Sequence, residues 1–288
     1  MALCIPIMNG DDFVRFMKKP NSKYRIEEEY KSIIMKQGEE IDSTPEQNKE
    51  LEIKGCLSYL QFLYYGPQLK NNQVLPGTSF VDGYDTKQKF LCTKNPLEED
   101  CGTFWQTVWD NQVEIIVMTD QLTDKSYQYW SPKEKHFFMC GKFKIKTQKI
   151  MIYPYFTVTL LSLTATALKP KQKRLIFHYQ YTAWLISNLC QADPFISFYF
   201  FVDSMYLQLR NVMPNKKFAP ILVHCFSGLG SSQVFCVIDV CITQFEKTKM
   251  LSLSHVLEKM REQKHGSINS SDLYVLCYQI MKNCLDRA

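Results

Sequence analysis

The chain of 288 residues is long enough for one large domain or two small ones, and 45% hydrophobic and 22% charged residues are typical of a folded globular protein. Lysine and arginine number 34 against 29 aspartates and glutamates, a net charge of +5. We expect this small excess to be spread along the chain, which argues against a dedicated nucleic-acid-binding protein. A basic surface would still suit an anionic or phosphorylated partner.

The cysteines and histidines do not have the spacing of a metal site. None of the 11 cysteines forms a C-x-x-C pair, and several lie in apolar periodic segments, where Cys acts as a small core residue. We therefore expect no zinc site, no cofactor and no disulfide framework. The N-terminus lacks the features of a signal peptide, and the most apolar stretches are too short and too polar to span a bilayer. These observations predict a monomeric cytoplasmic protein.

In chain order, the N-terminal part has the apolar spacing of helices, the first of them capped by Asp11 and Asp12. The middle of the chain is rich in β-branched and aromatic residues, which favour strands. We predict strands over Lys89–Cys92, Glu114–Met118, Phe137–Ile145 and Tyr155–Leu168, and a helix over Gly102–Asn111.

The last third of the sequence is mainly helical. Asp193 can cap a helix that has Pro194 in its first turn, Ser252 or Ser254 can cap another, and Ser270 can open a third. No stretch resembles a linker. We expect a single domain, in which residues 1–75 form an N-terminal helical segment packed on a core of residues 76–288.

One loop carries the functional argument. Val223–Val240 contains a short buried strand, a tight loop with Gly228 and Gly230, and an amphipathic helix. This arrangement directs backbone N–H groups and a helix N-terminus into one concavity, which suits a phosphate or another anion. Cys225 ends the strand, where a thiolate nucleophile would face the helix. The same pattern also fits an ordinary strand–loop–helix unit with a structural thiol.

The loop resembles a known motif. His224, Cys225, Gly228, Gly230 and Ser232 are similar to the His-Cys-five residues-Arg-Ser/Thr-Gly motif of the cysteine-dependent protein tyrosine phosphatases. Six further blocks resemble that family in the same order, namely Ser79–Tyr84, Phe90–Pro96, Phe104–Met118, Tyr127–Trp130, His178–Trp184 and Met260–Tyr274. The resemblance covers about residues 79–284. The segments FCVIDVC and REQKHGSI, at residues 235–241 and 261–268, are similar to those of the tyrosine phosphatase-like proteins of polydnaviruses. Parasitoid wasps deliver these viruses into caterpillar hosts.

The resemblance implies an α/β fold of the α+β type, with a twisted mixed central sheet flanked by helices on both sides. It implies Cys225 as the nucleophile of a phosphate loop made of Cys225, Phe226, Ser227, Gly228, Leu229, Gly230 and Ser231. Four positions depart from the family pattern: Ser231 replaces the signature arginine, Ile186 the general acid, Leu51 the ring-stacking tyrosine and Asn269 the water-positioning glutamine. The following glycine of the motif is Gln233.

These departures predict impaired catalysis. Serine supplies neither the charge nor the two-pronged geometry of arginine, and isoleucine cannot protonate a leaving phenolate. The leading hypothesis is a pseudophosphatase that binds host signalling proteins, including tyrosine-phosphorylated ones, in the host cytoplasm and thereby interferes with signalling or immunity. The alternatives are a residual cysteine-dependent phosphatase of altered substrate, a thiol redox sensor, and a chain that has degenerated without function.

Overall fold

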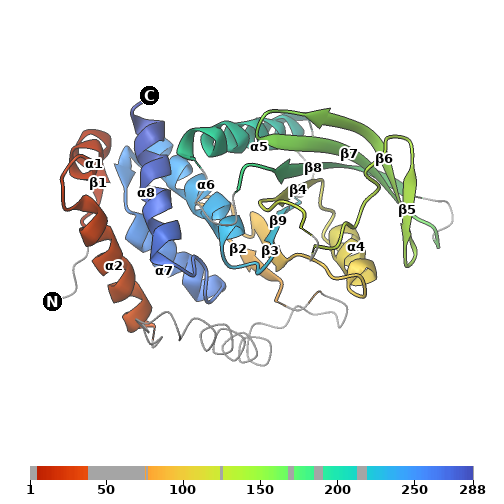
Figure 1. The fold of residues 1–288 in the computed structure, drawn as a ribbon, viewed down its shortest axis with the longest axis horizontal. Helices are drawn as coiled ribbons and strands as arrows, with labels where there is room; N and C mark the ends of the chain where they lie inside the picture. The colour runs from red at the N-terminus through yellow and green to blue at the C-terminus, as the bar shows by residue number, and fades with distance from the viewer. Residues whose placement is uncertain are drawn as a thin grey trace.

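The computed structural model describes residues 5–37, 75, 77–123, 126–167, 172–184, 191–212 and 219–287. A mixed sheet of eight strands in the order β2-β3-β9-β4-β8-β7-β6-β5 crosses the molecule (Figure 1). Its strands are β2 (Ser79–Val81), β3 (Phe90–Lys94), β4 (Ile115–Met118), β5 (Phe137–Cys140), β6 (Phe143–Ile152), β7 (Phe156–Ala165), β8 (Gln172–Tyr181) and β9 (Ile221–Cys225). The sheet of mixed direction confirms the expected fold class.

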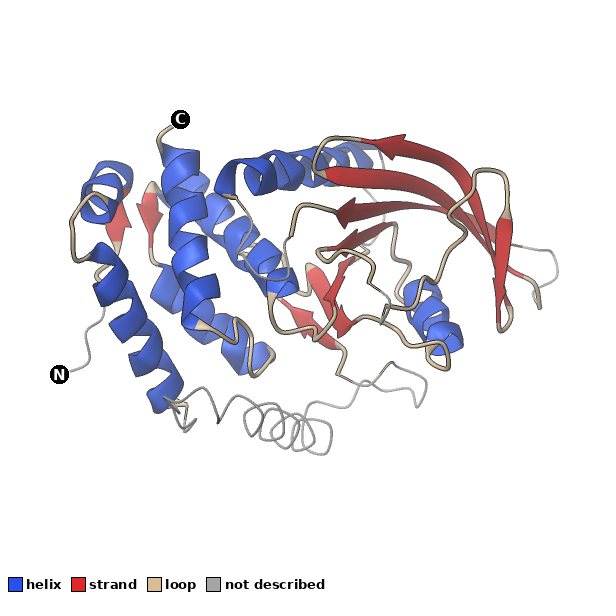
Figure 2. Cartoon of the chain, viewed as in Figure 1, coloured by secondary structure: helices blue, strands red, loops and turns tan. Residues whose placement is uncertain are grey.

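Helices cover both faces of this sheet (Figure 2). One face packs on α5 (Ala192–Val212), α6 (Ser231–Thr248), α7 (Leu253–Gln263) and α8 (Ser271–Leu285), and the opposite face packs on α4 (Cys101–Asp110). The strands alternate accordingly. On β7, Val158 belongs to the core beneath α5, whereas Leu161 and Leu163 belong to the core beneath α4.

The N-terminal helices pack on the C-terminal one. α1 (Gly10–Met17) and α2 (Ser22–Lys36) lie beside α8 at one end of the molecule (Figure 1). The ring of Phe13 stacks on that of Tyr278 at a centroid distance of 5.5 Å. In addition, β1 (Met8–Asn9) pairs antiparallel with β10 (Met250–Leu251). The expected division between residues 75 and 76 adjoins a stretch outside the described residues and stays a prediction.

The predicted helix caps are confirmed in part. Ser252 caps α7 and Ser270 caps α8, each by accepting a backbone N–H with its side chain. At α1 the cap is Asn9, whose side chain accepts the N–H of Asp12, so the two aspartates lie in the first turn instead. Helix α5 begins at Ala192, one residue before the expected cap.

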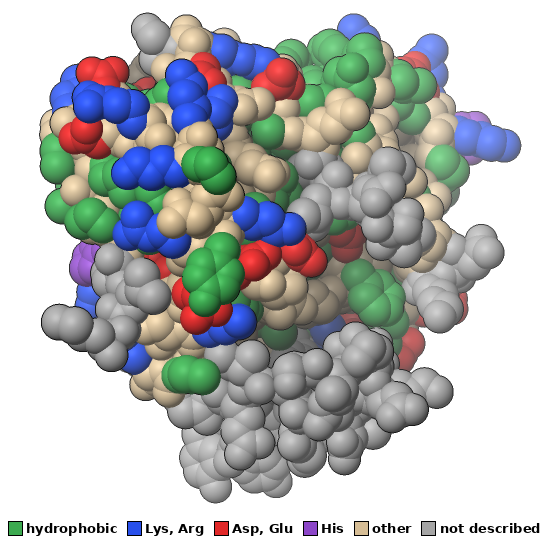
Figure 3. Space-filling model, turned by 60° about the vertical axis from the view of Figure 1, so that its left-hand side comes forward, with side chains coloured by type: hydrophobic (Ala, Val, Ile, Leu, Met, Phe, Trp, Pro, Cys, Tyr) green, Lys and Arg blue, Asp and Glu red, His purple; other side chains and the backbone are tan. Residues whose placement is uncertain are grey.

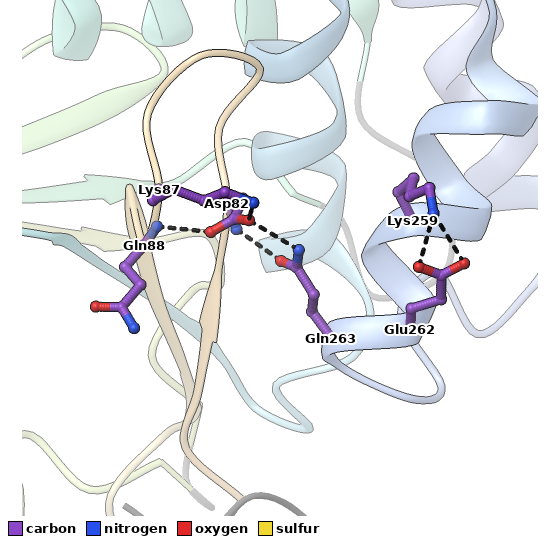
Figure 4. A network of polar contacts seen from close by, with 6 residues as sticks. All are labelled: Asp82, Lys87, Gln88, Lys259, Glu262 and Gln263. Atoms are coloured by element: carbon purple, nitrogen blue, oxygen red, sulfur yellow. Dashed lines mark hydrogen bonds and ion pairs between the residues drawn. The ribbon is translucent and has the colours of Figure 1, made fainter.

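A turn between strands is tied to a helix by side-chain contacts (Figure 4). After β2, the backbone N–H of Asp82 donates to Gln263 of α7 at 2.7 Å, and the Gln263 amide donates back to the Asp82 carboxylate at 3.1 Å. The same carboxylate accepts Lys87 at 2.7 Å and the N–H of Gln88 at 2.7 Å. This network fixes the approach to β3, which pairs directly with β9.

Two buried carboxylates hold the helical layer together. Lys89 and Asp239 form an ion pair of 2.7 Å with side chains only 8% and 2% exposed. Glu29 of α2 accepts the Ile5 N–H at 2.6 Å and the hydroxyls of Tyr274 and Tyr278 at 2.8 and 2.6 Å. A buried charge without such partners would be strongly destabilising.

Most described cysteines are buried thiols, as predicted, but one pair is bonded. Cys101 at the start of α4 and Cys140 at the end of β5 form a disulfide, which links the helix to the edge strand of the sheet. Within the described part of the chain, no cluster of His, Cys, Asp or Glu could hold a metal ion. None of the helices described there is long and apolar enough to cross a membrane.

The candidate active-site loop

The predicted loop connects the buried strand β9 to α6. β9 lies between β3 and β4 and runs parallel to both, so the carboxyl ends of the three strands meet at one edge of the sheet. Ligands of open α/β sheets bind at this edge. The chain leaves β9 at Cys225 and enters α6 at Ser231, so residues 226–230 form the loop.

Cys225 is held by hydrogen bonds to its sulfur. Its Sγ accepts the backbone N–H of Gly228 at 3.2 Å and shares a hydrogen bond of 3.0 Å with the hydroxyl of Ser232. The Oγ of Ser227 lies 4.0 Å away. Donors directed at a sulfur stabilise its thiolate form. The cysteine is 2% exposed, so it lies at the floor of the loop.

The backbone of the loop requires a glycine at one of its two glycine positions. Gly228 has a φ of +74°, and an added Cβ would lie 2.9 Å from the backbone of Thr93 and Lys94. A residue with a side chain would be strained there and would collide with β3. At Gly230 the nearest atom, Oδ1 of Asn269, would be 3.6 Å from an added Cβ, an ordinary contact.

Residues outside the loop fix its shape. The buried side chain of Gln233 donates to the carbonyl of Gly228 at 3.0 Å and accepts the hydroxyl of Ser267 at 3.2 Å. The backbone N–H of Ile268 donates to the carbonyl of Leu229 at 2.9 Å. Gln233, which replaces a glycine of the family motif, therefore braces the loop from the first turn of α6.

A carboxylate occupies the mouth of the loop. Asp120 follows β4, and its side chain accepts the backbone N–H of Phe226 and, at 2.7 Å, the hydroxyl of Ser231. It thus bridges the first and last parts of the loop. Burial raises the pKa of the Asp120 carboxyl above its usual range, while its hydrogen bonds to Phe226 and Ser231 act in the opposite direction.

The position of the signature arginine is part of this bridge. Besides Asp120, the hydroxyl of Ser231 lies 2.8 Å from that of Thr119. Thr119 in turn donates its N–H to the carbonyl of His224 at 3.1 Å. Ser231 is buried, so its hydroxyl points into the protein and not into solvent.

Two histidines and a tyrosine lie beneath the loop. The hydroxyl of Tyr129 is 2.7 Å from Nε2 of His224 and 2.8 Å from Nε2 of His178. Burial lowers the pKa of each histidine to about 3. The side chain of His224 thus bonds Tyr129 in the core beneath the loop.

Lys264 brings a buried cation near the cysteine. Its ammonium donates to the carbonyl of Gly77 at 2.8 Å, and the whole residue is only 3% exposed. Burial lowers the pKa of Lys264, and the thiols of Cys92 and Cys225 are close enough to act in the opposite direction. This lysine was not identified from the sequence.

The remaining predicted positions are only partly brought together. The ring of Phe226 is 61% exposed, so it points away from the loop floor. Ser227 accepts the N–H of Leu229 at 3.2 Å, and Asn269 lies beside Gly230. Leu51 and Ile186 lie outside the described residues.

Sequence analysis missed Asp120, although a signal for it was present. A carboxylate directly after a buried parallel strand lies at the edge of the sheet where ligands bind. The family motif contains no such carboxylate, so motif spacing identified the loop alone.

Comparisons with known proteins agree with this geometry. The family model described as Protein-tyrosine phosphatase matches residues 77–283. "Probable tyrosine phosphatase protein J2" of Microplitis demolitor bracovirus is 34% identical over 94% of this chain and 92% of its own length. "Tyrosine phosphatase H2" of the same virus is 27% identical over 96% and 88%. The human "Tyrosine-protein phosphatase non-receptor type 9" is 29% identical over 70% of this chain and 35% of its own length. The chain belongs to the protein-tyrosine phosphatase family.

Proposed function

We propose that this chain is a catalytically impaired phosphatase-like protein that acts by binding signalling proteins of a host cell. The observation that carries the proposal is the bridge from Asp120 to Phe226 and Ser231 across the mouth of the loop. The bracovirus relatives support the setting in a host cell. The proposal includes interference with host signalling or immunity, and action as a monomer in the host cytoplasm.

The bridge changes the electrostatics of phosphate binding. A phosphate needs donors and positive charge, and the family's arginine supplies both. Here the corresponding residue donates its one hydroxyl proton to a carboxylate. Two unit charges 4 Å apart near a protein surface repel by about 4 kcal/mol, more than the ~1.5–3 kcal/mol of a charge-assisted hydrogen bond. An ionised Asp120 therefore opposes phosphate more strongly than any single amide of the loop favours it.

The second missing group acts on a different step. The resemblance places the general acid at Ile186, which cannot donate a proton, and a positioned acid is worth about 10²–10⁴-fold in rate. Loss of the acid and loss of the arginine together leave Cys225 as a nucleophile without its chief partners. The loop chemistry therefore gives no preference for the phosphotyrosyl form of a partner over the non-phosphorylated form.

The test combines catalysis with binding. The wild-type chain should release no phosphate from a phosphotyrosyl peptide in a single-turnover assay. In calorimetry, it should not distinguish that peptide from its unphosphorylated twin. Ser231→Arg should gain preference for the phosphorylated peptide by about tenfold or more, because the Asp120 carboxylate can orient the new guanidinium toward the loop.

A matched control separates position from charge. Ser227→Arg adds the same charge at an exposed loop residue that has no contact with Asp120. It should leave the two peptides nearly equal. Stoichiometric phosphate release by the wild-type chain, lost on Cys225→Ser, would contradict the proposal.

A second function is supported by the sulfur contacts. Gly228 and Ser232 hydrogen-bond the sulfur of Cys225, the atom on which residual phosphatase activity or a redox sensor would depend. A redox role has a further feature in its favour, since the sulfurs of Cys92 and Cys236 lie 3.7 Å apart in the same core. Alkylation of Cys225 by iodoacetamide at neutral pH, no faster than that of an ordinary thiol, would remove this alternative.

A further inference from the structure

Positive charge is concentrated in one part of the chain, contrary to the even spread expected from the sequence. Residues 133–174 contain ten lysines and arginines and one glutamate, a formal charge of +9. The rest of the chain has 24 basic and 28 acidic residues, a charge of −4, which together give the total of +5. Such asymmetry points to an anionic partner for the basic part.

Strand pairing places three of these residues, Lys144, Lys146 and Lys173, on one face of the sheet. Across β5, β6, β7 and β8, one row of paired residues is Phe137, Lys146, Ser162 and Leu175, and the neighbouring row is Met139, Lys144, Thr164 and Lys173. Residues two apart on a strand point to the same side, so both rows lie on one face. These eight residues are called the basic face below.

The basic face continues the surface that α5 covers. Phe156 and Tyr179 lie on the same side of their strands and pack beneath that helix, whereas the α4 side is covered separately. Figure 1 shows α5 along one end of β7 and β8, with β5 at the far end. Beyond the helix, Phe137, Met139 and Leu175 are 55%, 50% and 50% exposed.

Among the described residues, the lysines of this face have no acidic partner. Within the described part of the chain, no ion pair joins Lys144, Lys146 or Lys173 to a carboxylate. The ammonium of Lys144 lies 3.9 Å from the ring centroid of Phe137, so a cation and an exposed ring form one contact surface. By contrast, acidic and basic side chains are interspersed on the face shown in Figure 3.

The edge of the sheet adds a second means of recognition. β5 is the last strand in the order and pairs on one side only, with β6. An edge strand presents unpaired N–H and C=O groups that an extended segment can pair with. A strand added there would place alternate side chains in the two rows, next to Phe137 and Met139 and within reach of Lys144 and Lys146.

We propose that the basic face and the β5 edge bind an acidic, extended segment of a partner protein that pairs with β5 as an additional strand. Acidic side chains at alternate positions would meet the lysines, while Phe137, Met139 and Leu175 would contact its apolar atoms. A protein strand suits this site better than an anionic membrane, because a strand uses both the lysines and the backbone hydrogen-bonding groups of the β5 edge, whereas a membrane surface uses the charge alone.

The test uses a synthetic ten-residue peptide of alternating Glu and Val, with a fluorescent label, and its Lys-Val counterpart. The full chain should bind the acidic peptide and not the basic one, more weakly at higher salt. Lys144→Glu/Lys146→Glu should weaken binding by about tenfold or more, since two attractions become repulsions. Hydrogen exchange of the amides in Phe137–Cys140 should slow when the peptide is bound.

The control reverses two exposed lysines elsewhere. Lys18→Glu/Lys19→Glu makes the same change in net charge at the end of α1 and should leave binding unchanged. Equal loss in both double variants, no binding of the acidic peptide, or binding without slower exchange in β5 would overturn the proposal. Binding to phosphatidylserine vesicles, but not to the peptide, would overturn it in favour of a membrane.

This inference rests on the proposed function only in treating the chain as a binding protein. The two fail separately. Phosphate release dependent on Cys225 would refute the proposed function while leaving peptide binding at β5 intact. Loss of peptide binding would leave the loop argument unchanged.

Discussion

The protein beneath the loop differs from the mouth of the loop in how its polar groups are satisfied. Below, Lys89 is paired with Asp239, and His224 is bonded to Tyr129, all of them buried. At the mouth, the carboxylate of Asp120 is held by a hydroxyl and a backbone N–H, and neither of these partners carries a charge.

The difference indicates which part of a phosphatase this chain retains. The support that shapes the loop contains the Lys89–Asp239 ion pair and the Tyr129–His224 hydrogen bond, and the sulfur of the cysteine keeps two hydrogen-bond partners. In the proposed function, the groups that would grip and protonate a substrate are the ones that are replaced. We therefore expect substitutions in the support to alter stability and substitutions at the mouth to alter ligand preference.

The largest effect is expected at the buried ion pair. Lys89→Met leaves the Asp239 carboxylate buried without its cation and should lower the free energy of unfolding by about 3–5 kcal/mol. Urea unfolding followed by circular dichroism measures it. Lys89→Met/Asp239→Leu removes both charges and should recover most of that loss. A double variant as unstable as the single one would show that lost packing, and not the unpaired charge, causes the loss of stability.

A smaller effect is expected in the loop backbone. Gly228→Ala forces a side chain into a left-handed conformation against β3 and should cost about 1–3 kcal/mol. Gly230→Ala is the matched control, because its added Cβ meets only ordinary contacts. Thermal unfolding of the two variants gives the comparison. Equal losses would mean that the close approach to Thr93 does not constrain the loop.

The smallest effect on stability, within about 1 kcal/mol, is expected for Asp120→Asn, because the fold already disfavours the ionised form. The effect of this substitution on the binding of anions should be larger. Sulfate keeps its charge between pH 7 and 5, so its binding reports on the protein alone. Since the pKa of Asp120 is raised, falling pH protonates the carboxyl and should strengthen sulfate binding to the wild-type chain.

The variant Asp120→Asn tests whether this carboxyl causes the pH dependence of sulfate binding. Asp120→Asn should bind sulfate more tightly at pH 7 and show little change on acidification. The stability contributed by the raised pKa is present at low pH and is lost as pH rises through that pKa. Sulfate binding to the wild-type chain that weakens toward pH 5 would show that Asp120 does not control the mouth of the loop.

Much of the fold could be predicted because its signals are local. The strand–loop–helix unit around Cys225, the caps at Ser252 and Ser270, and the strand over Glu114–Met118 follow from periodicity and residue type. Strand β8 was not among the predicted strands, although its last residues lie in the block His178–Trp184 that resembles the family.

Only the part of the candidate site that is contiguous in the sequence could be predicted. Motif spacing identified the loop from Cys225 to Ser231 and the loss of its arginine. It could not reveal that Asp120, more than a hundred residues earlier in the chain, bonds that same serine, because the contact depends on β4 and β9 lying side by side. The basic face was missed for the same reason, since strand register alone brings Lys144 beside Lys173 through β7.

The tyrosine shared by two histidines has a consequence for reading pH titrations of this protein. With both imidazoles held neutral down to about pH 3, neither His224 nor His178 changes charge in any buffer used for activity or binding measurements. The imidazole next to the nucleophile therefore adds no inflection to a titration curve. These two imidazoles are therefore a constant background for the ionisation of the Asp120 carboxyl at the mouth.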